Sequence, residues 1–255
     1  MFSWYKRWSN RTKSLMKDVR EIHNMVHMAQ SFQSLDADKV FRFPMLGEEI
    51  QLYLPYVGFD AIQQNIIKSA DFFEGELLRH VRRTYFTGER CKVLDIGGNI
   101  GNHAVFFAVF CNAEVTTFEP QSAIYKILQK NIELNASKIV AHNLALGESD
   151  LMATIKDYDT SNTGATQISE ACCGKIKVCP LDEFGFRDID FIKIDVEGFE
   201  SKVLRGGRET IMNSRPILWL EIFPENKKEV GSILAEYGYV LKEQIARHDY
   251  IFVPN

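Results

Sequence analysis

The stretch from residue 93 to residue 110 constrains the fold of this chain more than any other part of the sequence. It begins with an apolar pair typical of the end of a buried strand and closes with apolar residues at helical spacing. Between them lies a glycine-rich turn, Asp95-Ile-Gly97-Gly98-Asn99-Ile-Gly101. Glycine lets the backbone turn sharply and lets a ligand lie against it. Because the helix that follows points free N–H groups at the turn, the stretch predicts a strand, a ligand-binding turn and a helix.

A second feature indicates what kind of ligand this turn binds. Asn99 stands where many such turns have their central glycine, and asparagine tolerates the left-handed backbone region better than most residues. About twenty residues after the turn, the next expected strand ends at Glu119. A carboxylate at that place accepts hydrogen bonds from both ribose hydroxyls of an adenosine. Turn and acid together predict a nucleoside-cofactor site of the kind that NAD enzymes and methyltransferases share.

Strands and helices alternate from Arg90 to the C-terminus, which predicts an α/β fold with a parallel sheet. The expected strands cover residues 92–95, 114–119, 139–143, 189–195 and 216–221, and helices are expected from residues 101, 122, 198 and 227. Segments 239–243 and 250–254 are expected to close the sheet as an antiparallel pair. Residues 151–180 are expected to form irregular strands around the loop 160–166. The hydroxyl residues of that loop suit contact with a polyol or an ordinary solvent-facing turn.

The sequence upstream of residue 90 has a different pattern. Residues 1–30 carry tryptophan and aliphatic residues at helical spacing among many Lys and Arg, which predicts an amphipathic basic helix. Such a helix suits an anionic membrane surface, self-association or packing on its own domain. Residues 31–89, hereafter the cap, are expected to contain a β-hairpin and two short helices and to lie against the domain formed by residues 90–255, because they are too few for an independent core.

Composition restricts the partners and the compartment. A net charge of −4 gives no support for broad nucleic-acid binding. The five cysteines are an odd number without metal-like spacing, which indicates reduced thiols in a cytoplasmic protein. There is neither a secretory signal nor an apolar stretch of the roughly 20 residues that span a bilayer. We therefore expect a cytoplasmic location, with peripheral membrane contact through residues 1–30 as the alternative.

Four expected strands end in acids, namely Asp95, Glu119, Asp195 and Glu221. Ligands of open α/β sheets bind beyond the carboxyl ends of the strands, so these acids are expected to share one site. A single such acid often only caps the following helix, but four at corresponding positions are hard to explain by capping alone. The first two are expected to face the cofactor and the later two the substrate. Asp195 and Glu221 also suit a divalent cation; because the sequence lacks a clear third ligand, we expect no metal.

Two further residues near the expected site have alternative explanations. His103 lies one turn into the first helix of the α/β domain, where it either reaches the site as a base or packs as a structural side chain. Lys193 lies in the middle of the fourth strand, where a buried ammonium group is costly unless an acid pairs with it. We expect Lys193 to pair with a nearby acid or to point along the sheet edge, and not to be catalytic.

Taken together, these motifs resemble the FkbM-type family of class I S-adenosylmethionine-dependent methyltransferases. Residues 93–101 are similar to the first motif of class I methyltransferases. The FkbM-type pattern is found in Phe118-Glu-Pro, Asn143-Leu-Ala, Ile189-Asp-Phe-Ile-Lys-Ile-Asp-Val-Glu-Gly-Phe-Glu200, Val203-Leu-Arg-Gly-Gly and Arg215-Pro-Ile-Leu-Trp-Leu-Glu. Lys193-Ile-Asp195-Val-Glu197-Gly198 is the most specific part of this resemblance, which covers about residues 70–255.

The resemblance implies a fold, a cofactor and a set of site residues. The fold is a Rossmann-like, seven-stranded, mostly parallel sheet whose last strand is antiparallel, and the cofactor is S-adenosyl-L-methionine. The residues implied in binding it are Asp95, Gly97, Gly98, Asn99, Gly101, Asn102, Glu119, Pro120, Asn143, Leu144 and Ala145, with Glu119 at the ribose and 143–145 beside the adenine. A hydroxyl is a poor nucleophile, so methyl transfer gains from a carboxylate that orients it and takes its proton. The catalytic candidates are Asp195, Glu197, Glu221 and His103.

Three functions remain compatible with the sequence. The first is an O-methyltransferase that acts on a hydroxyl. The family resemblance favours a sugar hydroxyl in a surface glycan or a secondary metabolite. Nucleic acid is not an expected substrate, because no aromatic-and-basic motif follows the first 20 residues. The second is an NAD-dependent oxidoreductase. Three features argue against it: Asn99, the Glu-Pro pair at 119–120 and the acids of the later strands. The third is a non-catalytic module that recruits a partner through residues 1–30.

Overall fold

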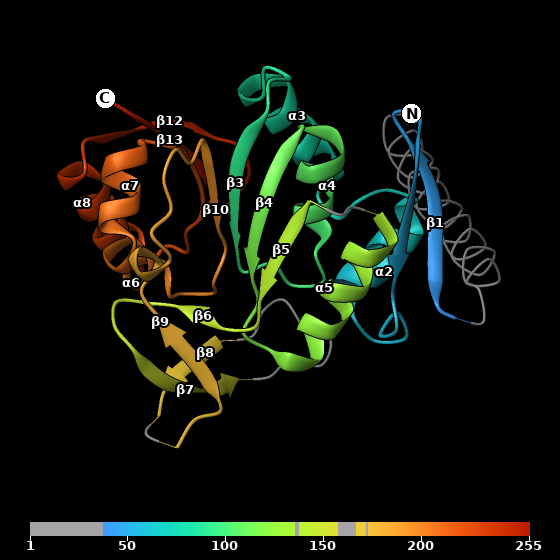
Figure 1. Ribbon diagram of the computed structural model, residues 1–255, viewed down its shortest axis with the longest axis horizontal. Coiled ribbons are helices and arrows are strands. Elements are labelled where there is room, and N and C mark those ends of the chain that lie inside the picture. Colours follow the sequence, from blue (N-terminus) through green and yellow to red (C-terminus); the bar gives the residue numbers. More distant parts are fainter. Residues whose placement is uncertain (1–37, 136–137, 158–166, 172) are drawn as a thin grey trace, which may run out of the picture.

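A computed structural model describes residues 38–135, 138–157, 167–171 and 173–255 (Figure 1). Its main element is a seven-stranded sheet with the strand order β12-β13-β11-β10-β3-β4-β5. In chain order the strands are β3 (Cys91–Ile96), β4 (Ala113–Phe118), β5 (Ile139–His142), β10 (Phe191–Ile194), β11 (Ile217–Glu221), β12 (Tyr239–Gln244) and β13 (Asp249–Pro254). Strands β11, β10, β3, β4 and β5 run parallel to one another, whereas β13 is antiparallel to both β11 and β12. The predicted Rossmann-like sheet with an antiparallel last strand is thus confirmed.

Helices cover both faces of this sheet (Figure 1). On one side lie α4 (Asn102–Phe110) and α5 (Ser122–Asn135), and on the other α6 (Glu200–Gly206), α7 (Arg208–Ser214) and α8 (Lys227–Glu236). Strand β3 serves both layers, because Val93 packs into the cluster under α4 and Leu94 into the cluster under α6–α8. The predicted helix after Gly198 is divided in two. A Cβ atom at Gly206 would overlap the carbonyl oxygen of Gly147. The backbone at this break therefore lies directly against the loop that contains Gly147.

The described part of the cap shares the core of the main domain. It contains the antiparallel hairpin of β1 (Val40–Met45) and β2 (Glu48–Tyr53), followed by α2 (Ala61–Ser69) and α3 (Gly75–Tyr85). Asn131 of α5 accepts a hydrogen bond from the backbone N–H of Tyr53 at 2.6 Å and donates one to the carbonyl oxygen of Ile100 at 2.8 Å. One side chain therefore ties the hairpin to the glycine-rich turn. Apolar side chains of the hairpin belong to the same buried cluster as those of α4.

Four shorter strands form a second, smaller sheet with the order β6-β9-β7-β8, drawn below the main one in Figure 1. Its strands are β6 (Ala145–Leu146), β7 (Leu151–Asp157), β8 (Gln167–Glu170) and β9 (Ile176–Cys179), and a short 3-10 helix, η1 (Leu181–Phe184), follows. The irregular strands expected here are therefore paired with one another. Strand β6 continues from the end of β5, so this sheet borders the carboxyl edge of the main one.

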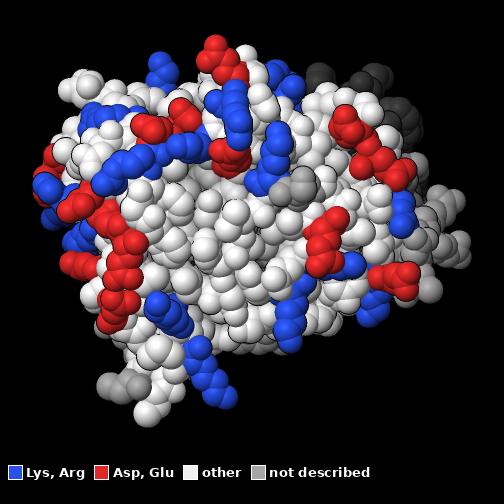
Figure 2. All heavy atoms as spheres, in the orientation of Figure 1, with Lys and Arg blue, Asp and Glu red and all other residues white. Residues whose placement is uncertain are grey.

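No helix of the described residues has the length and apolar character that crossing a membrane requires. The predicted helix over 1–30 and the loop 160–166 lie outside the part of the chain that the structure describes. The described cysteines, Cys91, Cys111, Cys173 and Cys179, are free thiols. On the face in Figure 2, Lys and Arg alternate with Asp and Glu around an uncharged central area.

Candidate functional site

A cavity opens at the carboxyl ends of β3, β4, β10 and β11. Twelve of the residues singled out in the sequence line it: Gly97, Gly98, Asn99, Asn102, His103, Glu119, Pro120, Leu144, Ala145, Asp195, Glu197 and Glu221. Three others, Asp95, Gly101 and Asn143, are outside the lining. The sheet thus brings the expected cofactor residues and the expected catalytic residues to one hollow.

The glycine-rich turn has the backbone that its sequence indicates. Gly97, Asn99 and Gly101 have positive φ angles of 89°, 46° and 86°. A Cβ atom at Gly97 would overlap the backbone carbonyl of Asp195, so glycine allows β3 and β10 to end side by side. A Cβ at Gly98 would overlap the hydroxyl of Thr117. The turn is therefore packed against both neighbouring strands, and its exposed side faces the cavity.

Glu119 joins the turn to the end of β4. Its Oε2 accepts the backbone N–H of Asn99 at 3.0 Å, and its Oε1 accepts that of Gln121 at 2.7 Å. Burial raises the pKa of Glu119 to about 7, although these two hydrogen bonds favour the ionised form. The side-chain oxygen of Asn99 is buried and has no hydrogen-bond partner among the described residues. Glu119 and Asn99 thus offer oxygen atoms to the hydroxyl and amino groups of a nucleoside cofactor, so this end of the cavity fits such a group.

The predicted cofactor residues outside the lining have supporting contacts. Asp95 is fully buried, and Thr117 donates a hydrogen bond to its Oδ2 at 3.3 Å. Burial raises the pKa of Asp95, and its Oδ1 has no partner in the described structure. Asn143 donates its amide hydrogens to the carbonyl oxygens of Glu119 and Pro120, at 2.8 and 3.2 Å. Asp95 therefore supports the end of β4 through Thr117, and Asn143 supports the segment that follows β4 through the backbone of Glu119 and Pro120.

Three carboxyl groups meet at the other end of the cavity. Asp195, Glu197 and Glu221 each present an oxygen atom, and these atoms lie within 4.8 Å of one another. Burial, followed by the charge of Asp195, raises the pKa of Glu221 to about 10, and the same two causes raise the pKa of Glu197 to about 7. Glu221 and Asp195 share a side-chain hydrogen bond. Glu197, predicted as a catalytic residue, thus joins Asp195 and Glu221 in a group of three oxygen donors close enough together to hold a divalent cation.

Lys193 explains why the neighbouring Asp195 stays ionised. Its side chain is 3% exposed, and its Nζ donates to Asp195 Oδ2 at 2.9 Å, so the expected pairing with an acid is confirmed. Burial acts to raise the pKa of Asp195, but the charge of Lys193 and the hydrogen bonds from Glu221 and Lys193 hold it below its usual range. Of the close pair, Asp195 is therefore the carboxylate and Glu221 carries the proton.

His103 faces the cavity together with a residue that the sequence did not single out. Its ring is buried edge-to-face against Trp219, with the centroids 5.4 Å apart, and its Nε2 lies 3.2 Å from Glu74 Oε2. That contact is within ion-pair distance, but Nε2 has no well-directed hydrogen bond in the described structure. Glu74 and Phe73, both from the cap, also line the cavity.

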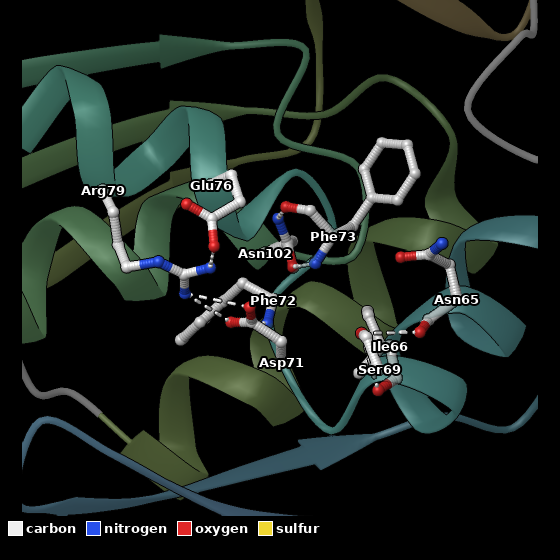
Figure 3. A network of polar contacts seen from close by, with 9 residues as sticks. All are labelled: Asn65, Ile66, Ser69, Asp71, Phe72, Phe73, Glu76, Arg79 and Asn102. Atoms are coloured by element: carbon white, nitrogen blue, oxygen red, sulfur yellow. Dashed lines mark hydrogen bonds and ion pairs between the residues drawn. The ribbon is translucent and has the colours of Figure 1, made fainter. Parts of the chain in front are cut away.

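The side chain of Asn102 holds this part of the cap in place (Figure 3). Its Oδ1 accepts the backbone N–H of Phe73 at 2.9 Å, and its amide donates to the carbonyl oxygen of Phe73 at 3.0 Å. Asn102, predicted as a cofactor residue, thus uses its polar atoms on the cap. The sequence pattern predicts a helix from about Asp71 with Phe73 on its apolar face, but α3 begins only at Gly75, so Phe73 and Glu74 lie in the turn before it and no motif marks them as site residues. A second missed residue, Asp249, accepts the Trp219 Nε1–H at 2.8 Å at the edge of the cavity.

The chain matches the model of a known protein family. The model of the Methyltransferase FkbM domain matches residues 95–241, which is more than half of the chain. A curated relative, Methyltransferase 1 of Beauveria bassiana (strain ARSEF 2860), is 27% identical over 142 residues. That alignment covers 45% of this chain and 57% of the relative, so the chain matches little more than half of the length of that protein.

Solved structures with a similar fold include two methyltransferases. The methyltransferase FkbM from Methylobacillus flagellatus KT is 21% identical with a TM-score of 0.48, and the match covers 90% of this chain and 59% of that one. A precorrin-6y C5,15-methyltransferase from Geobacter metallireducens GS-15 is 10% identical with a TM-score of 0.46, and the match covers 70% of this chain and 87% of that one.

Proposed function

The chain belongs to the FkbM methyltransferase family, and on that premise we propose that it transfers the methyl group of S-adenosylmethionine to a hydroxyl of a sugar, in a small molecule or a glycan. The observation that carries this proposal is the arrangement of one cavity with two different ends. Glu119 and the glycine-rich turn lie at one end, and the carboxyl groups of Asp195, Glu197 and Glu221 lie at the other. A nucleoside cofactor and a hydroxyl acceptor thus have separate, adjoining places.

The residues at the first end would bind the cofactor. Glu119 would accept hydrogen bonds from the ribose hydroxyls, and the side-chain oxygen of Asn99 would accept one from an amino group. Leu144 and Ala145 supply apolar wall for the adenine. The bound cofactor supplies an electrophilic methyl group on its sulfonium sulfur. Since that methyl group is already reactive, positioning of the acceptor accounts for much of the catalysis.

The residues at the second end would bind and deprotonate the acceptor. Asp195 is ionised beside Lys193, so it can accept a hydrogen bond that orients the hydroxyl. Glu197, whose pKa is about 7, is the stronger base and can take the proton. Glu221 keeps its own proton at neutral pH because its pKa is about 10. That proton is donated to Asp195, so Glu221 offers its remaining carboxyl oxygen as an acceptor. Two carboxyl groups with acceptor oxygens side by side suit a sugar hydroxyl, which donates a hydrogen bond.

Calorimetric binding of S-adenosylmethionine and S-adenosylhomocysteine to the purified chain tests the proposal. We expect saturable binding of both, weakened about a hundredfold in Glu119→Gln, because the amide removes the negative charge and replaces one of the two acceptor oxygens by a donor. Glu133→Gln is the matched control, since that side chain is exposed on α5, and it should bind like the parent. If the parent chain binds NAD and neither methionine nucleoside, the proposed function is wrong.

A further inference from the structure

We propose that Glu74 is the residue by which the cap binds the acceptor, and that it selects acceptors presenting a hydroxyl over those presenting an anionic group. This inference rests on the proposed methyl transfer and deepens it. Glu74 comes from the turn between α2 and α3, outside the residues 95–241 that match the family model. Its carboxylate lines the same cavity as Asp195 and Glu221.

The turn that carries Glu74 is built to a fixed shape (Figure 3). Asp71 accepts the backbone N–H of Phe72 at 2.8 Å and forms an ion pair with Arg79 at 2.9 Å. Gly75 lies directly under the Asp71 carboxylate, where a Cβ atom would overlap it. With the two hydrogen bonds between Asn102 and Phe73, the turn is anchored on both sides of Glu74. The backbone of Glu74 is thus held in place by contacts on both sides of it.

The backbone of Glu74 is in a conformation that glutamate does not favour. Its φ is 59°, in the left-handed region where only glycine, asparagine and aspartate are common. It precedes the first residue of α3, but its side chain makes no capping hydrogen bond to that helix. Helix capping therefore does not explain the glutamate. Strained residues of this kind persist where the surrounding structure fixes them, and they gather at ligand sites.

The carboxylate of Glu74 is available to a ligand. Its side chain is 31% exposed, and its only ionic contact among the described residues is the 3.2 Å approach of Oε2 to His103. Burial acts to raise the pKa of Glu74, but His103 and Lys193 together hold it below its usual range, so the group is ionised at neutral pH. No described residue donates a hydrogen bond to Oε1. An ionised carboxylate only accepts hydrogen bonds, so the group that meets it must donate one.

The charge around Glu74 excludes an anionic partner. The described lining of the cavity contains no Lys or Arg side chain, whereas the ionised carboxylates of Glu74 and Asp195 belong to residues that line it. A phosphate or carboxylate on the acceptor would face these groups without a compensating cation and would lose its hydration. A sugar hydroxyl meets no such penalty, because it donates to a carboxylate directly.

The test follows labelled methyl from S-adenosylmethionine into a small-molecule and glycan extract of the source organism, separated by anion exchange into an uncharged pool and an anionic pool. We expect the parent chain to label the uncharged pool. Glu74→Gln keeps the shape and removes the charge, so it should raise the KM for that pool about tenfold. Glu76→Gln is the control, because Glu76 lies two residues away and pairs with Arg79 on the exposed side of the same turn (Figure 3). It should behave as the parent chain.

A second variant separates a binding role from a structural one. Glu74→Gly removes the side chain and relieves the left-handed strain, so we expect an unchanged or higher Tm together with the raised KM. Labelling of the anionic pool alone, or a parent-like KM in both Glu74 variants, would overturn the inference. Calorimetry with S-adenosylhomocysteine reports on the methyl transfer separately: all three variants should bind it like the parent. Loss of that binding in the parent chain itself would refute the proposed function instead.

Discussion

At the scale of single residues, the chemistry of the cavity follows from several carboxyl groups that are buried close together. They do not share one protonation state. Lys193 keeps Asp195 ionised, whereas Glu221 carries a proton and the pKa of Glu119 lies near neutrality. The strand-end acids could be located from the sequence, because in a parallel sheet each strand ends at the same edge. Their different protonation could not, since it depends on distances between residues far apart in the chain.

The pKa of Glu119 predicts how cofactor binding depends on pH. The ionised form accepts ribose hydroxyls better than the protonated form, and with a pKa of about 7 the ionised fraction rises between pH 6 and pH 8. We expect the affinity for S-adenosylhomocysteine to rise about tenfold over that range. Calorimetry at several pH values measures this. Glu119→Gln should show a weaker affinity that varies little with pH; an equal slope in that variant would assign the effect to another group.

At the scale of elements, the turns determine what reaches the cavity. The glycine-rich turn was predictable because Gly97, Asn99 and Gly101 each occupy a left-handed position that their residue type favours. The turn between α2 and α3 was not, because its left-handed residue is Glu74, which carries no such signal. The break between α6 and α7 and the small sheet β6–β9 likewise depend on contacts between segments distant in sequence. Residues beside a family motif were thus easier to predict than residues brought in by the cap.

The contact between Asn102 and Phe73 predicts that the turn between α2 and α3 serves acceptor binding and the glycine-rich turn serves cofactor binding. Asn102→Ala leaves the backbone N–H of Phe73 without its partner, so we expect a loss of about 2 kcal/mol in stability. The released turn should bind the acceptor more weakly, whereas the affinity for S-adenosylhomocysteine should change little. Denaturation and calorimetry check both points, with Asn65→Ala on the exposed face of α2 as the control. A loss of cofactor affinity beyond tenfold would instead support the cofactor role that the sequence suggested for Asn102.

At the scale of the whole molecule, the cap and the α/β domain are parts of one core. Hairpin residues Phe43 and Leu52 are buried in the same cluster as Phe106 of α4. Polar contacts also join the two parts, because Asn131 forms hydrogen bonds with both the hairpin and the glycine-rich turn. The sequence predicts a cap that packs against the domain because it is too short for a core of its own, and in the structure the described cap residues share a buried cluster with α4.

The acids of this cavity reduce the stability of the ligand-free protein as the pH rises. The pKa values of Glu119 and Glu197 are raised to about 7 and that of Glu221 to about 10, from a usual value of 4.5. Between pH 4.5 and pH 10 the folded state therefore holds protons that the unfolded state has released, so these groups make the free energy of unfolding fall with increasing pH. The lowered pKa values of Glu74 and Asp195 act in the opposite sense, but only at acid pH.

We accordingly expect the Tm of the ligand-free protein to fall from pH 6 to pH 9, and Glu221→Gln to reduce that slope. The glutamine amide is neutral at every pH, so it avoids repulsion from Asp195 without having to bind a proton. The variant should therefore melt several degrees above the parent at pH 9. Glu133→Gln, on the exposed face of α5, should melt like the parent at each pH. Scanning calorimetry decides the matter. A parent-like slope in Glu221→Gln would mean that Glu221 is not the group that holds the proton, and the pairing of one carboxylate with one carboxylic acid at the acceptor end of the cavity would have to be abandoned.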